Sequence, residues 1–244
     1  MVQALAARTA ELHRALAVST GDPSFDPVPF TADQLGEWAR TIHAELDTTL
    51  QTLRAGRSEL PAATRDVAAR ALESTERLHA TIDKHAAGPT SSLAIRLHGD
   101  FHLGQVLVTG NDFIITDLEG EPGRSLAERR RKHTVLKDIA AMGRSFDYAR
   151  VMAARQFAAK PRSGAPDVGA LLEDWRVRVH AEFRAAYRTA IADCGVWPRD
   201  ETETDRLLKL ATIERLLYEI RYELSHRPEF IAVPLADLTA LLAT

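Results

Sequence analysis

Apolar residues recur at helical spacing along most of this 244-residue chain, and only one block in its middle departs from that pattern. The periodicity predicts helices over about 4–17, 31–53, 61–85, 136–157, 168–192, 205–224 and 235–242. Thr31 or Asp33 is the candidate N-cap of the second of them. The polar, breaker-rich stretch 160–166 fits a loop between two helices. A fold dominated by helices is therefore expected.

The exceptional block contains short runs of β-prone residues. Two of these runs, 106–108 and 113–116, are separated by Gly110-Asn111-Asp112, which is typical of a β-hairpin. The run 93–97 predicts one more strand before the hairpin. We expect a mainly α single domain with one small β-hairpin. Along the chain this domain divides into three consecutive segments, which are 1–90, 91–122 and 123–244.

Charge and composition exclude several classes of protein. The 31 Lys and Arg nearly balance the 34 Asp and Glu, and the net charge of -3 gives no general reason to expect a nucleic acid or an anionic membrane as partner. The single cysteine, Cys194, cannot form an internal disulfide. The first residues lack the features of a signal peptide, and no apolar stretch reaches the ~20 residues of a membrane-spanning helix. A cytoplasmic protein is expected.

The most informative motif is HGDFHLGQ at 98–105, which is followed by an aspartate, Asp117, beyond the predicted hairpin. In protein kinases a catalytic-loop Asp accepts the proton of the substrate hydroxyl, an amide five residues later holds one metal ion, and an Asp beyond a short hairpin holds magnesium. Asp100, Gln105 and Asp117 reproduce this order. A hairpin returns the second carboxylate to the same end, where hard oxygens can share Mg²⁺ with the phosphates of ATP.

Several residues of this region have more than one reading. His98 is either part of the loop or a buried core histidine, and His102 either orients the loop or touches substrate. Asp100 on its own could be a turn residue, and Asp117 a strand-end cap. Asp138 begins a helical pattern, so it either caps the helix dipole or buttresses the Asp100 loop by accepting backbone hydrogen bonds.

Seven motifs resemble bacterial maltokinases, which are relatives of the aminoglycoside phosphotransferases. These motifs are RTAELH at 8–13, HGDFHLGQ at 98–105, DLEGEP at 117–122, LAERRR at 126–131, KDIA at 137–140, RSFDY at 144–148 and YEIRYEL at 218–224. The resemblance implies the C-terminal, helical lobe of a protein-kinase-like fold that uses ATP and Mg²⁺. It implies maltose as acceptor and maltose 1-phosphate, for α-glucan and glycogen synthesis, as product; glucosamine or an aminoglycoside is the alternative. Leu118 stands where many members have an aromatic residue.

The resemblance also assigns roles to individual residues. Asp100 would be the catalytic base, and Gln105 and Asp117 would be the magnesium ligands. The acceptor-binding candidates are His102, Glu119, Tyr222 and Glu223. His98 and Asp138 would support the loop.

One part of a complete kinase of this type is missing from the sequence. Residues 1–90 hold only Gly21, Gly36, Gly56 and Gly88, contain no glycine-rich loop, and have helical periodicity. We therefore expect the β-rich N-terminal lobe to be absent, so that a preceding lobe or a complementary chain would complete the site. Two rival readings are a metal-dependent phosphoesterase, which would need further Asp, Asn and His clusters, and a non-catalytic kinase-like interaction module.

Overall fold

The computed structural model describes residues 1–159 and 167–243, so the expected loop at 160–166 lies outside the described residues. The chain divides into two compact units. Unit 1 comprises Met1–Phe30 and Ser91–Asp200, and unit 2 comprises Thr31–Thr90 and Glu201–Thr244. Each unit combines segments that are distant in sequence.

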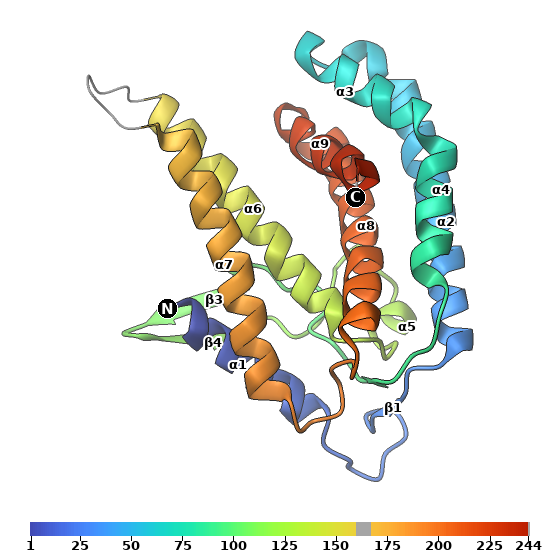
Figure 1. Cartoon of the computed structure of the whole chain (residues 1–244), viewed down its shortest axis with the longest axis vertical. Helices are drawn as coiled ribbons and strands as arrows, with labels where there is room; N and C mark the ends of the chain where they lie inside the picture. The colour runs from blue at the N-terminus through green and yellow to red at the C-terminus, as the bar shows by residue number, and fades with distance from the viewer. Residues whose placement is uncertain (160–166, 244) are drawn as a thin grey trace. The chain divides into compact units, whose positions relative to one another are not determined.

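Unit 1 contains three long helices, the hairpin and several short elements (Figure 1). They are α1 (Val2–Leu16), β1 (Val28–Pro29), β2 (Leu93–Ala94), η2 (Leu103–Gln105), β3 (Val106–Thr109), β4 (Asp112–Ile115), α5 (Leu126–Arg129), α6 (Leu136–Ala158) and α7 (Val168–Ile191). Helix α7 packs against both α1 and α6. Leu5, Thr9 and His13 recur every fourth residue along α1 and are buried, as are Phe183 and Tyr187 of α7. These two stripes form much of the core of unit 1.

The hairpin is the antiparallel pair β3 and β4, joined through Gly110, whose φ of 61° suits the tight turn. Arg8 of α1 donates to Asp112 at the start of β4 through Nε and Nη2, at 2.8 and 2.9 Å. This two-point contact fixes the hairpin against α1. A second antiparallel pair, β1 with β2, matches Val28 to Ala94.

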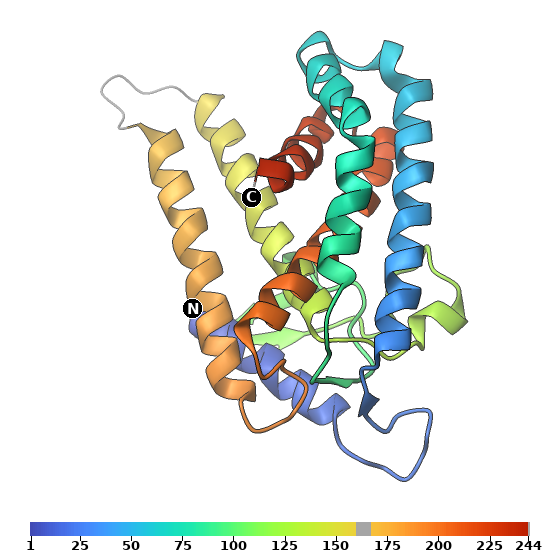
Figure 2. The same ribbon diagram turned by 45° about the vertical axis from the view of Figure 1, so that its right-hand side comes forward.

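In the described residues of unit 2, all regular secondary structure is helical (Figure 2). Its elements are α2 (Ala32–Gly56), η1 (Arg57–Glu59), α3 (Ala62–Glu73), α4 (Thr75–Ala86), α8 (Glu201–His226), η3 (Pro228–Phe230), α9 (Ala232–Ala240) and η4 (Leu241–Ala243). Thr31 caps α2 in a reciprocal capping box with Gln34. The indole of Trp38 on α2 donates to the Glu214 carboxylate on α8 at 2.9 Å, which satisfies two buried polar groups in the core.

The expected mainly α fold with a small β-hairpin is confirmed, while three local predictions were wrong. The pattern at 61–85 is two helices, because Ser74 leaves helical geometry with φ of -94° and ψ of 11°. The strand expected at 93–97 is only the two residues of β2, since just two register pairs form with β1, which was not predicted. The short helix α5 was also missed, although Ser125 and Glu128 form a capping box there.

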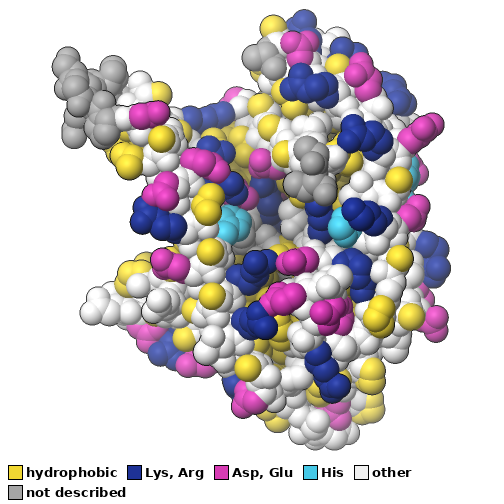
Figure 3. Space-filling view, in the orientation of Figure 1, with side chains coloured by type: hydrophobic (Ala, Val, Ile, Leu, Met, Phe, Trp, Pro, Cys, Tyr) yellow, Lys and Arg dark blue, Asp and Glu magenta, His cyan; other side chains and the backbone are white. Residues whose placement is uncertain are grey.

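The surface agrees with the near-balance of charge. On the face drawn in Figure 3, acidic and basic side chains alternate without a large region of one sign. None of the helices in the described part of the chain is both long and apolar enough to cross a membrane.

Candidate active site

The segment between β2 and η2 is a tight loop that carries Asp100. Gly99 has a φ of 80°, a conformation that glycine adopts without a steric penalty. The fully buried His98 closes the loop: its Nε2–H donates to the Thr116 carbonyl at 2.9 Å, and its Nδ1 accepts from the Asp100 N–H at 3.4 Å. A carbonyl only accepts, which fixes the hydrogen on Nε2. His98 thus ties the Asp100 loop to the strand end that precedes Asp117.

Asp117 lies two residues after the end of β4, in a second loop that lies against the first. Among the residues described, Asp117 is the one non-glycine with positive φ, at 65°. Left-handed backbone costs roughly 1–2 kcal/mol for a residue with a side chain and is concentrated at functional sites. A Cβ added to Gly99 would lie 3.4 Å from the Cα of Gly120, so the two loops approach each other at two glycines.

The base of the hairpin brings Gln105 and Asp117 together. Nε2 of Gln105 donates to Oδ2 of Asp117 at 2.8 Å. The Gln105 carbonyl accepts from the N–H of Thr116 at 2.9 Å and from its hydroxyl at 3.1 Å. This pairing extends the register of β3 and β4 by one residue pair, and it places the amide and the carboxylate at the same end of the hairpin.

Asp138, in the first turn of α6, is a buried carboxylate behind the Asp100 loop. It accepts from the N–H groups of His98 at 2.9 Å and Gly99 at 3.1 Å, which is the buttressing contact considered from the sequence. It also accepts from Nε2 of His13 at 3.1 Å, and Nδ1 of His13 lies 2.6 Å from the Tyr187 hydroxyl. A continuous buried chain of polar contacts therefore connects α7, α1 and α6 to the loop.

Burial and hydrogen bonding act in opposite directions on Asp138. Burial alone would raise the pKa of its carboxyl, but the hydrogen bonds that it accepts from His13 and from the Gly99 N–H hold the pKa below its ordinary value. Burial also raises the pKa of Tyr187 well above its ordinary value. The carboxylate is therefore kept ionised and the phenol protonated, and the phenol can donate to His13.

Sequence reasoning missed three supporting residues of this site. His13 and Tyr187 belong to the chain behind Asp138, and the hydroxyl of Ser145 accepts from the Leu103 N–H at 3.0 Å. The signal for His13 was available, because it falls on the buried stripe of α1 formed with Leu5 and Thr9. A polar side chain on an apolar stripe needs a buried partner. Nothing local in the sequence indicated which partner.

His102 is oriented toward Asp100 by its own backbone neighbourhood. Its Nδ1 accepts from the Gly104 N–H at 3.0 Å, so the ring hydrogen sits on Nε2 when the imidazole is neutral. That Nε2 lies 3.8 Å from Oδ2 of Asp100. A Cβ at Gly104 would approach the ring to 2.7 Å, so the ring position depends on a glycine there.

The donors at the hairpin base fit Mg²⁺. This ion is usually bound through one or two carboxylates, water and the phosphates of the substrate. Asp117 supplies a carboxylate, and a half-turn of the Gln105 amide would present its oxygen beside it. Across the described residues no group of three or more His, Cys, Asp or Glu could hold a metal ion, so such a site would depend on the nucleotide phosphates for its remaining ligands.

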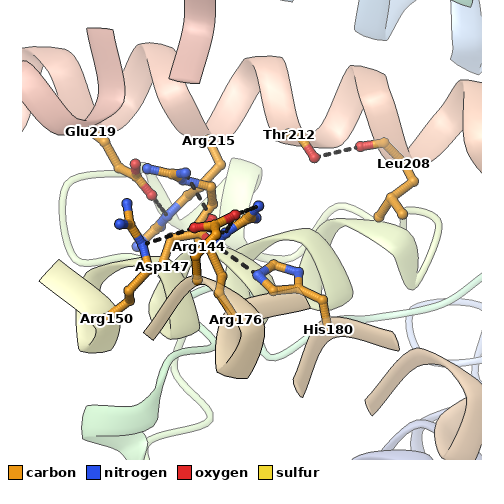
Figure 4. Close-up of polar contacts among 10 residues, drawn as sticks. Arg144, Asp147, Arg150, Arg176, His180, Leu208, Thr212, Arg215 and Glu219 are labelled. Carbon is orange, nitrogen blue, oxygen red and sulfur yellow. Dashed lines mark hydrogen bonds and ion pairs between the residues drawn. The ribbon is translucent and has the colours of Figure 1, made fainter. Parts of the chain in front are cut away.

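A second charged cluster lies between α6 and α7 around Asp147 (Figure 4). Arg144 donates to Asp147 at 2.9 Å, His180 contacts it at 3.0 Å, and Arg176 lies 3.6 Å away. Burial would raise the pKa of Asp147, but the hydrogen bond from His180 and the charges of Arg144 and Arg176 lower it. The cluster contains more positive than negative side chains and joins the two helices.

The remaining predicted site residues are not brought into these contacts. The side chain of Glu119 is exposed, and its carbonyl accepts from Arg129 at 3.3 Å. Tyr222 and Glu223 belong to α8 in unit 2. Glu223 is fully buried and accepts from Arg227 at 3.0 and 2.7 Å, whereas Tyr222 is 38% exposed.

The mainly helical fold, with the hairpin and its two loops, is that of one kinase-like lobe. No protein-family model matches the chain. The chain is homologous to glucosamine kinases. That of Streptacidiphilus jiangxiensis is 28% identical over 237 residues, which cover 96% of this chain and 47% of the relative. That of Mycolicibacterium smegmatis (strain ATCC 700084 / mc(2)155) is 30% identical over 145 residues, covering 59% of this chain and 34% of the relative.

Solved structures agree with this relationship. Crystal form A of a glucosamine kinase matches with a TM-score of 0.75 and 25% identity, covering 99% of this chain and 53% of that one. A glucosamine kinase in complex with glucosamine, ADP and inorganic phosphate matches with a TM-score of 0.75 and 24% identity, over 99% of this chain and 51% of that one. The chain thus spans between about a third and about a half of the length of these relatives.

Proposed function

We propose that this chain is the part of an ATP-dependent sugar kinase that carries the catalytic base and the metal ligands. The observation that carries the proposal is the 2.8 Å contact between Gln105 and Asp117 at the base of the hairpin. Asp138 and His98 hold the Asp100 loop beside it through the hydrogen bonds described above. The homology to glucosamine kinases supports the same chemistry.

The proposed roles follow from the chemistry of each group. Asp100 accepts the proton of the acceptor hydroxyl as that oxygen attacks the γ-phosphorus of ATP, while the bond from this phosphorus to the bridging oxygen breaks and ADP leaves. Gln105 and Asp117 hold Mg²⁺, which when bound neutralises charge on the phosphates. His102, whose Nε2 lies 3.8 Å from Oδ2 of Asp100, is assigned to orienting the loop, and Asp138 to fixing it. In phosphoryl transfer the protein contributes chiefly by positioning the reactants and neutralising the charge of the phosphates.

The acceptor is proposed to be a small sugar, with glucosamine the first candidate. The curated relatives are glucosamine kinases, and a matching structure is described as holding glucosamine with ADP and phosphate. Maltose is the second candidate, because the motifs at 98–105, 144–148 and 218–224 resemble those of maltokinases. His102, Glu119, Tyr222 and Glu223 remain the proposed acceptor-binding residues.

A nucleotide-clamping lobe is proposed as the partner of this chain. Strands occur among the described residues only as two pairs, and neither belongs to an extended sheet with a glycine-rich loop. The relatives are about twice as long as this chain, so a second half of comparable size is available in them. Joining or mixing the chain with the N-terminal half of a related glucosamine kinase should complete the nucleotide site.

The test is an acceptor screen with this completed kinase. We expect release of ADP that requires ATP, Mg²⁺ and a sugar, fastest with glucosamine, and little turnover by the chain alone. Maltose and an aminoglycoside serve as the competing acceptors. A preference for maltose would support the sugar-kinase assignment but identify maltose, not glucosamine, as the acceptor. A completed, folded protein that binds ATP but phosphorylates none of these sugars would favour the non-catalytic interaction module instead.

A further inference from the structure

Two histidines of unit 2 meet head to head between α2 and α4, which pack together (Figure 2). Nδ1 of His43 lies 2.6 Å from Nδ1 of His79. Nε2 of His43 lies 2.9 Å from a carboxylate oxygen of Asp83, and Nε2 of His79 lies 3.1 Å from one of Asp47. Each helix thus contributes one histidine and, four residues later, one aspartate. The helices run antiparallel, since each histidine faces the aspartate of the other helix.

The two rings are nearly coplanar and lie edge to edge. Their planes differ by 14°, and their centroids are 4.9 Å apart, which is about the Nδ1 to Nδ1 distance plus the two ring radii. The lone-pair directions of both Nδ1 atoms therefore point into the same small gap. Such an alignment serves one shared hydrogen, or one ion, between two nitrogen donors.

In the absence of a metal ion, the gap between the two Nδ1 atoms must hold a hydrogen. A carboxylate only accepts, so both Nε2 atoms carry hydrogen. The contact between the Nδ1 atoms then requires one further hydrogen shared by His43 and His79, which gives the pair a single positive charge. Without a cation in the gap, two lone pairs would face each other at 2.6 Å. The arrangement thus calls for one cation at this point.

We propose that His43 and His79 bind one divalent transition-metal ion, such as Zn²⁺, in place of the shared proton. Imidazole nitrogen suits Zn²⁺, Ni²⁺ and Cu²⁺. A metal-bound histidine commonly donates its second ring N–H to a carboxylate, which orients the ring and makes the nitrogen a better ligand. Asp83 and Asp47 already provide this contact for both rings. The site lies wholly within unit 2 and is independent of the kinase proposal.

The metal would be held by two protein nitrogens and by water. Zn–N bonds are about 2.0–2.1 Å long, so the gap must open by less than ~2 Å through rotation of the two side chains. The imidazoles are 25% and 29% exposed, which leaves room for water ligands. Over the described chain no third His, Cys, Asp or Glu completes a cluster here, so the site should be open. A bound ion would link α2 to α4.

The experiment is a titration of the untagged, metal-stripped full chain with ZnCl₂ alone, followed by calorimetry and by thermal unfolding. We expect one equivalent to bind with release of a proton, and the unfolding midpoint to rise by roughly 5–10 °C at about 100 times the dissociation constant. His43→Asn and His79→Asn should each abolish this binding. His226→Asn is the matched control, because it removes an exposed histidine of the same unit. It should leave zinc binding and the zinc-induced rise of the unfolding midpoint unchanged.

Asp47→Asn and Asp83→Asn keep the proposal testable if the histidine variants do not fold. Each should weaken zinc binding by about 10–100-fold, because it removes only the carboxylate that orients a ring. The proposal would be overturned if the unaltered chain did not bind one saturable equivalent of zinc. Zinc binding that survives in the folded His43→Asn/His79→Asn double variant, or that is unaffected by both aspartate substitutions, would overturn it as well.

Discussion

At the scale of single residues, the two carboxylates of the candidate site are expected to have different catalytic roles. Asp117 contacts Gln105 and is proposed as a magnesium ligand, whereas Asp100 is proposed as the base that accepts the proton. In the completed kinase, Asp117→Asn should raise the Mg²⁺ concentration needed for half-maximal rate by at least about 10-fold, because it weakens a metal ligand. Asp100→Asn is the control and should leave that concentration unchanged. Identical magnesium curves for the Asp117 variant and the parent would contradict the assignment.

Asp138 allows a prediction about stability and pH. Its folded pKa lies below the ordinary value of 3.8, so the unfolded state takes up its proton first as the pH falls. The stabilisation is therefore complete above that value and is lost as the pH falls through the lower, folded pKa. Asp138→Asn should lower the free energy of unfolding by about 3–5 kcal/mol at neutral pH, as expected when a buried charged network loses a partner.

Urea unfolding of the parent and the Asp138→Asn variant at pH 7 and at pH 3 measures this effect. The difference in unfolding free energy should be large at pH 7 and smaller at pH 3, because at pH 3 the unfolded parent already binds a proton on Asp138 and is stabilised by it. A difference that is constant across the two pH values would show that the carboxylate charge is not what stabilises the loop.

At the scale of elements, the turn η2 should control the position of His102. The ring lies so close to Gly104 that a Cβ would meet it at 2.7 Å, and the backbone of Gly104 does not have positive φ. Gly104→Ala should therefore displace the ring without unfolding the loop, lowering turnover of the completed kinase by roughly 10–10²-fold. Gly123→Ala, where a Cβ would have open space, is the matched control. Equal rates for the two variants would argue against a positioning role for His102.

Most of the secondary-structure elements could be predicted from the sequence. The hairpin and most helices follow from local patterns, since turn residues and apolar spacing act over a few residues. The break at Ser74 and the strand β1 did not follow, because the first depends on one residue's dihedral angles and the second on a partner far along the chain. The contact of His13 with Asp138 spans 125 residues, and no local rule encodes such a pair.

At the scale of the whole molecule, this chain matches between about a third and about a half of each relative, and it contains the Asp100 loop, the hairpin and the residues that support them. Asp100, Gln105 and Asp117 were predicted from their kinase-like order, and the hairpin explains why the last two meet, since it fixes where its two ends lie. Of the residues that support them, His98 and Asp138 were also indicated by the sequence, whereas His13, Tyr187 and Ser145 were found only in the folded chain. We therefore expect the proposed activity to depend on a nucleotide-clamping partner.

The most direct measurement of the central claim is the rate of sugar phosphorylation by the completed kinase and by its Asp100→Asn variant, at saturating ATP and Mg²⁺. Asn keeps the shape of the side chain and removes its basicity, so the rate should fall roughly 10²–10⁴-fold, the usual share of general-base catalysis, while ATP affinity is retained. An Asp100→Asn enzyme as fast as its parent would contradict the account, because the proton would then be accepted elsewhere.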